Sequence, residues 1–136
     1  MQDEPRPPEI LAAVARYLRD IVAPETKGHI NFNVRVCANA LEMMRRHLEI
    51  APAAEAAELG RLKAMLGMDG DLLALNAELC RRLESGAIDP AAPAVREHLW
   101  ETTMAKLAVD QPTYWGYRAA LAERPPATET QKVQEP

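Results

Sequence analysis

The stretch from Ile30 to Ile50 constrains the fold most, because its apolar residues recur with the helical period yet occupy two faces. A first stripe consists of Ile30, Val34, Cys37, Leu41, Met44 and Leu48. At about 100° per residue, a second stripe lies on another face and consists of Phe32, Val36, Met43 and Ile50. A helix at the edge of a bundle needs only one stripe. The second indicates either a central helix packed from two sides or a contact with another protein.

A polar ribbon lies between the two stripes and contains Asn31, Arg35, Asn39, Glu42, Arg46 and Glu49. Asparagine is a poor helix former, because its amide competes for backbone hydrogen bonds. Asn31, Asn33 and Asn39, together with Arg35, are therefore an unusual choice for a face that meets only water. A central helix packed within its own bundle and a helix that contacts a partner both stay open, and the two can hold along different halves.

Helical segments are predicted along most of the chain. They run from about 8 to 22, 29 to 48, 51 to 67, 69 to 86 and 90 to 111, with a short helix or turn over 113–123. Pro52 is expected to separate the second segment from the third, and Gly67 to cap the third. Asp69 or Asp71 is expected to cap the start of the fourth. No segment alternates as a strand does. We predict an all-α fold, a single-domain up-and-down bundle of four to five helices over residues 1–124, with a disordered tail over 125–136.

Two of these helices carry specific expectations about burial. In the first, a single apolar stripe formed by Ile10, Val14, Tyr17 and Ile21 predicts one side that faces the core. In the fourth, Asn76 lies inside the stripe formed by Leu72, Leu75, Leu79 and Leu83. A buried amide without a partner costs about 1–3 kcal/mol. Asn76 is therefore expected to hydrogen-bond to the polar ribbon or to a helix end, or to line a binding surface.

Charge and cysteine usage exclude several classes of protein. The net charge of -4 has the wrong sign for a protein that follows phosphate backbones, so nucleic acid is not an expected partner. No apolar run approaches the ~20 residues of a membrane span, and the acidic, proline-rich start does not resemble a signal peptide. Cys37 and Cys80 lie in helical apolar patterns, which predicts buried free thiols. We expect a cytoplasmic protein.

The chain lacks the motifs of catalytic sites. Ser85 is its single serine and follows a predicted helix, where capping is the expected role. There is no glycine-rich phosphate loop, and no Glu-x-x-His pair of the kind that holds two metal ions in a helical bundle. His98 and Glu101 are expected to form a surface pair. We therefore predict no catalytic residue, no metal site and no cofactor site in this chain.

An aromatic cluster follows the last long helix. Tyr114, Trp115 and Tyr117 fall within four consecutive positions after Asp110 and Pro112. Such a cluster is either a latch over the bundle or an exposed anchor for a partner. With the residues of the central helix and Asn76, it completes the predicted partner-binding set: Asn31, Phe32, Arg35, Asn39, Asn76, Asp110, Tyr114 and Trp115.

Four segments, in this order and spacing, carry a resemblance to a known family: RPPEILAAVARYLRD, FNVRVCANALEMMRRHLE, DLLALNAELCRRL and AKLAVDQPTYWGY. The chain resembles a family of small all-helical bacterial proteins of unknown function, encoded beside aminoglycoside-phosphotransferase-like kinases and acyl-CoA dehydrogenases. The family includes the small subunit of a 4-hydroxyacyl-CoA kinase of levulinate catabolism. The pattern is carried by Phe32, Arg35, Val36, Asn39, Asn76, Leu79, Lys106, Asp110, Pro112 and Tyr114. Trp115 departs from it.

The resemblance implies a non-catalytic accessory subunit. Its partner would be an aminoglycoside-phosphotransferase-like kinase subunit that holds ATP and Mg²⁺ and phosphorylates the hydroxyl of a 4-hydroxyacyl-CoA in short-chain acid catabolism. Two alternatives from other classes stay open. One is a stand-alone homo-oligomeric helical bundle, and the other is an acyl-CoA-binding module that acts alone.

Overall fold

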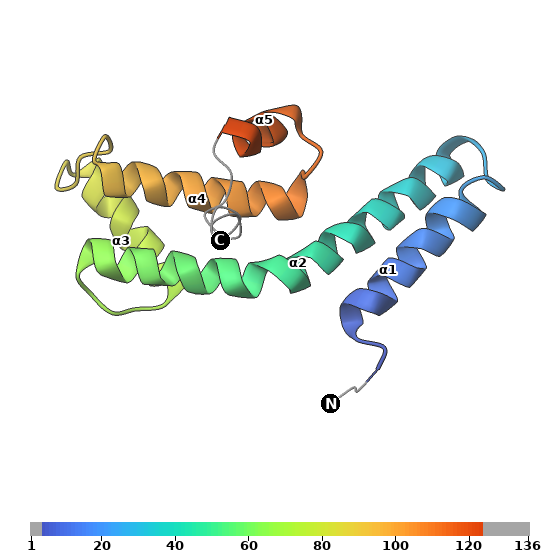
Figure 1. Ribbon diagram of the computed structural model, residues 1–136, viewed down its shortest axis with the longest axis horizontal. Helices are drawn as coiled ribbons and strands as arrows, with labels where there is room; N and C mark the ends of the chain where they lie inside the picture. Colours follow the sequence, from blue (N-terminus) through green and yellow to red (C-terminus); the bar gives the residue numbers. More distant parts are fainter. Residues whose placement is uncertain (1–3, 124–136) are drawn as a thin grey trace, which may run out of the picture.

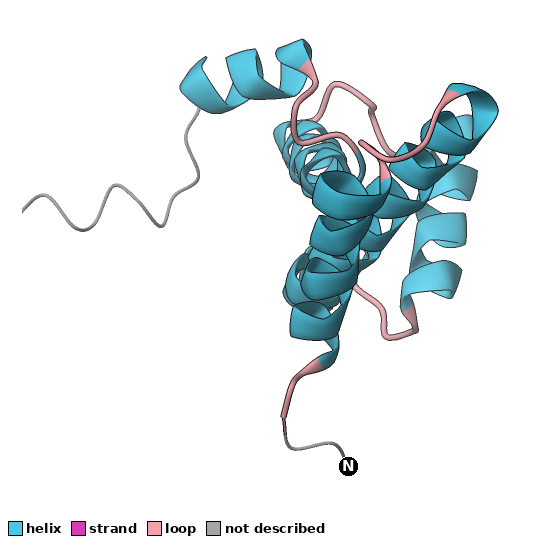
Figure 2. Cartoon of the chain, turned by 90° about the vertical axis from the view of Figure 1, so that its right-hand side faces the viewer, coloured by secondary structure: helices cyan, strands magenta, loops and turns pink. Residues whose placement is uncertain are grey.

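The computed structural model describes residues 4–123. Its elements are α1 (Pro7–Tyr17), which a π-helical turn η1 (Leu18–Val22) continues, α2 (Gly28–Leu66), α3 (Leu72–Glu84), α4 (Pro93–Asp110) and α5 (Trp115–Glu123). Over these residues the chain forms helices and loops without a strand (Figure 2). The prediction of an all-α fold with four to five helices is confirmed. The predicted disordered tail, 125–136, lies outside the described residues.

Helix α2 joins the two parts of the molecule. Its first half pairs with α1 in an antiparallel hairpin, and its second half packs against α3 and α4 (Figure 1). Among the described elements, α1 contacts only α2 and η1, and α5 contacts only α4. The result is an elongated molecule in which α5 stands apart from the other helices (Figure 2).

The prediction that Pro52 separates two helices is wrong, because α2 runs through this residue without a break. Proline inside a helix lacks the N–H that would bind the Leu48 carbonyl, and it costs about 3 kcal/mol. The contacts that α2 makes before and after Pro52 outweigh that cost. Ala51, next to it, is buried, the first half of α2 packs on α1, and the second half packs on α3 and α4. Figure 1 shows α2 bending in its middle, as helices with an internal proline do.

The hydrophobic core lies where the second half of α2 meets α3. It contains Leu62, Leu66, Leu75 and Leu79, with five partly buried apolar residues packed around them, Leu59, Met65, Leu72, Leu83 and Ile88. Local sequence signals begin and end the helices around this core as predicted. Gly67 ends α2 in the left-handed conformation, and the Asp71 carboxylate accepts from the Ala74 N–H at 2.7 Å. The Ser85 hydroxyl donates to the Arg82 carbonyl at the end of α3.

Burial in the hairpin differs from what the stripes predicted. Its buried residues are alanines, Ala15 and Ala23 on the α1 side and Ala38 on α2. The expected core stripe of α1, Ile10, Val14, Tyr17 and Ile21, is exposed. In the first stripe of α2, Val34 and Leu41 are half-buried, whereas Ile30, Cys37, Met44 and Leu48 are exposed. Small residues bring the two helices close together, and no third element among residues 4–123 covers their larger neighbours.

The prediction of buried thiols is also wrong. Cys37 and Cys80 are free and both are exposed. Each lies in an apolar helical pattern, but on the side of its helix that no described element covers. In the described part of the chain, no helix combines the length and the apolar character needed to cross a membrane.

Candidate partner-binding surface

The loop that follows α4 folds back on the first half of α2 and forms an open groove, which we call the loop groove. Its volume is about 760 Å³. The lining residues include Val36, Asn39, Met43 and Arg46 of α2, and Asp110, Pro112 and Tyr114 after α4. Three predicted partner-binding residues, Asn39, Asp110 and Tyr114, are thus brought together from distant parts of the sequence.

Arg46, which lines the loop groove, links α2 to the end of α4. Its Nε donates to the Val109 carbonyl at 2.6 Å, near the C-terminus of α4. A cation at this position satisfies a carbonyl that the helix leaves free, and it interacts favourably with the helix dipole. Arg46 belonged to the predicted polar ribbon but not to the predicted site. The sequence gives no sign of its partner, which lies 63 residues away.

Of the aromatic cluster, Tyr114 lines the loop groove, and Trp115 follows it at the start of α5. The rings of Tyr114 and Trp115 lie 5.6 Å apart and are tilted by 56°. Trp115 is 76% exposed, so it covers no core. Gly116 allows the tyrosine ring to pack closely against the backbone, since a Cβ there would lie 2.7 Å from Cε1 of Tyr114. Of the two interpretations, latch and exposed anchor, the exposure of Trp115 supports the anchor.

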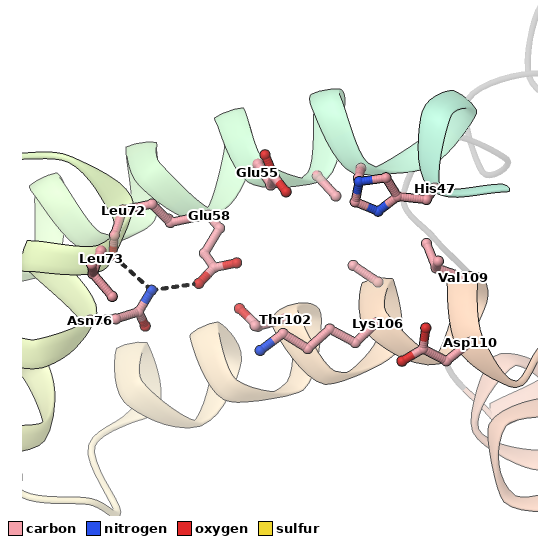
Figure 3. Close-up of a pocket in the computed structure, with 13 residues that line it drawn as sticks. His47, Glu55, Glu58, Leu72, Leu73, Asn76, Thr102, Lys106, Val109 and Asp110 are labelled. Carbon is pink, nitrogen blue, oxygen red and sulfur yellow. Dashed lines mark hydrogen bonds between the residues drawn. The ribbon is translucent and has the colours of Figure 1, made fainter. Parts of the chain in front are cut away.

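A second groove, the interhelical groove, lies between α2, α3 and α4 and has a volume of about 490 Å³ (Figure 3). Asn76 lines it and is held as predicted, although its partner is Glu58 and not the polar ribbon. Its amide donates to Glu58 Oε1 at 2.9 Å and to the Leu72 carbonyl at 3.0 Å. Figure 3 shows Glu58 and Asn76 pointing toward one another across the groove. Asp110 lines both grooves.

Buried polar groups lie next to the interhelical groove. Glu58 is buried, His98 is only 2% exposed, and Arg61 Nη2 donates to the Thr102 hydroxyl at 3.3 Å. The His98 Nδ1 and Arg61 Nε atoms are buried without a hydrogen-bond partner among the described residues. Burial lowers the pKa of His98, and the charge of Arg61 lowers it further. The predicted surface pair of His98 with Glu101 is therefore wrong.

Glu58 is a residue that the sequence analysis missed. It lies on the same helical face as Ala51 and Leu62, both buried, and its position on that face is the signal that could have found it. A carboxylate on a buried face needs a donor, and Asn76 was predicted to need a partner. Glu58 and Asn76 therefore meet each other's need for a hydrogen-bond partner.

The remaining predicted residues lie outside both grooves. The Asn31 amide donates to the carbonyls of Ala23 and Thr26, and its Oδ1 accepts from Arg35 Nε at 3.0 Å. Asn31 therefore fixes the connection between α1 and α2, and Arg35 packs beside it. Phe32 is 66% exposed on the first turns of α2.

Within residues 4–123, no three histidine, cysteine, aspartate or glutamate side chains gather closely enough to hold a metal ion. The arrangement offers apolar, aromatic and polar contacts to another molecule. No curated protein and no solved structure matches the chain. The sequence model described as a domain of unknown function, DUF6285, matches residues 24–114, which is more than half of the chain and includes the lining of the interhelical groove and all of the loop groove except Arg19. The chain therefore belongs to the DUF6285 family.

Proposed function

We propose that this chain is a non-catalytic accessory subunit that binds an aminoglycoside-phosphotransferase-like kinase through the loop groove. The observation that carries the proposal is the exposed aromatic pair, Tyr114 and Trp115, at the edge of a groove with apolar and polar lining. Large aromatic side chains dominate binding energy when a partner removes them from water.

The residues that line the loop groove have the composition of a protein–protein interface. Val36 and Met43 supply an exposed apolar floor, and Asn39 and Asp110 supply a polar rim. Specific interfaces combine an apolar centre that contains aromatic residues with a rim of hydrogen-bonding groups. The second apolar stripe of α2 thus meets the loop groove along Val36 and Met43, while Phe32 extends it toward the hairpin.

The identity of the partner rests on the resemblance to the small kinase subunit. The kinase would hold ATP and Mg²⁺ and transfer phosphate to the hydroxyl of a 4-hydroxyacyl-CoA, and this chain would support it in the cytoplasm. The residues that carry the resemblance include Asn39, Asp110 and Tyr114, all of which line the loop groove.

Co-expression with the kinase encoded beside this chain tests the proposal. We expect the two proteins to co-purify, and the complex to convert ATP and 4-hydroxyacyl-CoA faster than the kinase alone. Trp115→Ala should weaken the complex by about tenfold or more, the scale of an interface anchor. Leu99→Ala is the matched control, since Leu99 is an exposed apolar residue of α4 that lines neither groove. Equal binding by both variants, or no complex at all, would contradict the proposal.

An acyl-CoA-binding module that acts alone is the second candidate, and the interhelical groove is the observation that favours it. Its volume lies in the range of small-molecule sites, and Leu72 and Val109 contribute apolar walls. However, the carboxylates of Glu55, Glu58 and Asp110 also line this groove and outnumber its one lysine, Lys106, so its charge disfavours the phosphates of coenzyme A. Titration of the isolated chain with an acyl-CoA, followed by calorimetry, separates the two candidates, because only the module binds without the kinase.

A further inference from the structure

One side of the α1/α2 hairpin is a continuous apolar surface, which we call the hairpin face. Its exposed members are Ile10, Val14, Tyr17 and Ile21 of α1, and Ile30, Cys37, Met44 and Leu48 of α2. Apart from Cys37, these side chains are between 36% and 58% exposed. A monomer rarely leaves so many large apolar residues together in water.

Helical geometry places both stripes on the same side. The helices meet at Ala15 and Ala38, which are fully buried. On each helix the exposed stripe lies roughly 100–130° from that alanine, in the same rotational sense. Because the two helices are antiparallel (Figure 1), the same sense of rotation brings both stripes to one side of the hairpin.

The other side of the hairpin has the opposite character. A shallow hollow there is lined by Arg6, Glu9 and Arg16 of the α1 side and by Glu42, Arg45 and Glu49 of α2, together with Pro8 and Ala12. Most of these charges are paired within the chain, with Arg6 on Glu9 at 2.8 Å and Arg45 on Glu49 at 2.6 Å. The hairpin face contains no charged residue. It therefore requires no charge-complementary partner.

The spacing of the hairpin face is that of a coiled-coil seam. On α1 the positions 10, 14, 17 and 21 are separated by four, three and four residues. On α2 the positions 30, 34, 37, 41, 44 and 48 alternate the same separations over nearly three heptads. Such a seam packs against another helix with the same repeat. A helical hairpin that carries two such seams side by side has the form of one half of a four-helix bundle.

We propose that a second copy of this chain covers the hairpin face, so that two hairpins form an antiparallel four-helix bundle. The chain itself carries the matching half, and two-fold symmetric dimers are the commonest homo-oligomers. The residues from Ile30 to Leu48 span about 27 Å at 1.5 Å per residue, and two packed helices are about 20 Å wide. Two such faces cover about 1,100 Å² in total, above the roughly 1,000 Å² that a biological interface needs.

The dimer face is separate from the loop groove, so both interfaces can be occupied at once. Seen along α2, the loop groove is lined by Val36, Asn39 and Met43, which point away from the stripe that contains Cys37 and Met44. The dimer proposal therefore does not depend on the kinase, and its test uses the full chain alone.

Sedimentation velocity over a wide concentration range tests the assembly. We expect the wild-type chain to sediment with twice its 15.1 kDa mass. Tyr17→Glu places a charge in the centre of the hairpin face and should raise the dimer dissociation constant by about a hundredfold or more. Leu99→Glu introduces the same charge at an exposed residue of α4 outside the face and should leave it unchanged. Circular dichroism checks that both variants keep their helices.

The two cysteines give a second readout that needs no variant. Both thiols are exposed in the monomer, but only Cys37 lies in the hairpin face. In the dimer, Cys37 should react with a thiol reagent at least about tenfold more slowly than Cys80, and dilution should remove the difference. A monomer at every concentration, equal reactivity of the two thiols, or protection of Cys37 only after the kinase is added would overturn the proposal.

Discussion

The two halves of this molecule carry similar apolar patterns but bury them differently. In the half built from the end of α2, α3 and α4, the stripe residues Leu62 and Leu75 are fully buried. In the hairpin, the stripe residues Tyr17 and Ile30 are mostly exposed, and alanines occupy the interior. Periodicity therefore defines which side of a helix is apolar, whereas the number of neighbouring elements decides whether that side is covered.

The two halves therefore contribute differently to the stability of the chain and to the proposed dimer. The half that contains the leucine cluster supplies the stability of the isolated chain, because it holds most of the large buried side chains. The buried residues of the hairpin are alanines, and its larger apolar side chains would be covered only in the proposed dimer. Substitutions in the two halves should therefore differ both in size and in their dependence on protein concentration.

The largest effect is expected in the leucine cluster. Leu62→Ala removes a fully buried side chain and should lower the free energy of unfolding by about 2–5 kcal/mol. Tyr17→Ala, at a concentration where the chain is monomeric, should change it by less than about 0.5 kcal/mol, because Tyr17 is exposed. Urea denaturation followed by circular dichroism measures both. Equal losses from the two substitutions would show that the hairpin contributes as much stability as the cluster.

A smaller loss is expected from the polar contact that crosses the interhelical groove. Asn76→Leu removes the donor to the buried Glu58 carboxylate and should cost about 1–3 kcal/mol, although leucine matches the stripe around it. Asn33→Leu is the control, since Asn33 is exposed on the first half of α2. Thermal unfolding decides the matter. A higher melting temperature for Asn76→Leu would refute the role of the hydrogen bond.

Two glycines in helices should respond to alanine in opposite ways. At Gly60 a Cβ meets nothing within 4 Å, so Gly60→Ala should stabilise the chain by up to about 1 kcal/mol. At Gly116 the same Cβ would lie 2.7 Å from the Tyr114 ring, so the gain in helix propensity should be cancelled. Because the ring must move, Gly116→Ala should also weaken kinase binding, whereas Gly60→Ala should not. A stabilised Gly116→Ala variant that binds normally would argue against a positioned Tyr114.

The sequence predicted the helices better than their partners. Gly67, Asp71 and Ser85 act through neighbours in the chain, so local rules placed them correctly. The break at Pro52 was predicted from the same rules and is wrong, because packing on two sides of α2 overrides a local cost. Local signals are reliable where no tertiary contact opposes them.

The candidate site was predicted in part for a related reason. Asn39, Asp110 and Tyr114 were selected as unusual residues, and the fold brings them into one groove. Arg46 and Glu58 were not selected, because a charged residue on a helix looks ordinary until its distant partner is known. Asn31 was unusual for another reason, since its amide holds the turn between α1 and α2.

The smallest effect concerns pH and separates the ion pairs of the leucine half from those of the hairpin. Hydrogen bonds from Arg81 and Arg82 lower the pKa of Glu78 to about 2. Arg82 also donates to the Leu66 carbonyl at 3.0 Å, so this carboxylate supports the contact between α3 and the end of α2. A lowered pKa means that the folded state favours the ionised form. Its contribution is complete above the ordinary glutamate pKa of about 4.5 and is lost as the pH falls toward 2.

Glu78→Gln should therefore flatten the decline of stability between about pH 4.5 and pH 2, while a matched Glu84→Gln at the end of the same helix should not. Arg45 in the hairpin pairs with two carboxylates as well, but it connects them only within α2. Its replacement by alanine should leave the packing of α3 on α2 unaffected, because Arg45 and both carboxylates lie on α2 and ion pairs within one helix contribute little. Urea denaturation at a series of pH values measures all three variants. A profile for Glu78→Gln that follows the wild type would show that the arginine pair stabilises α3 without the carboxylate.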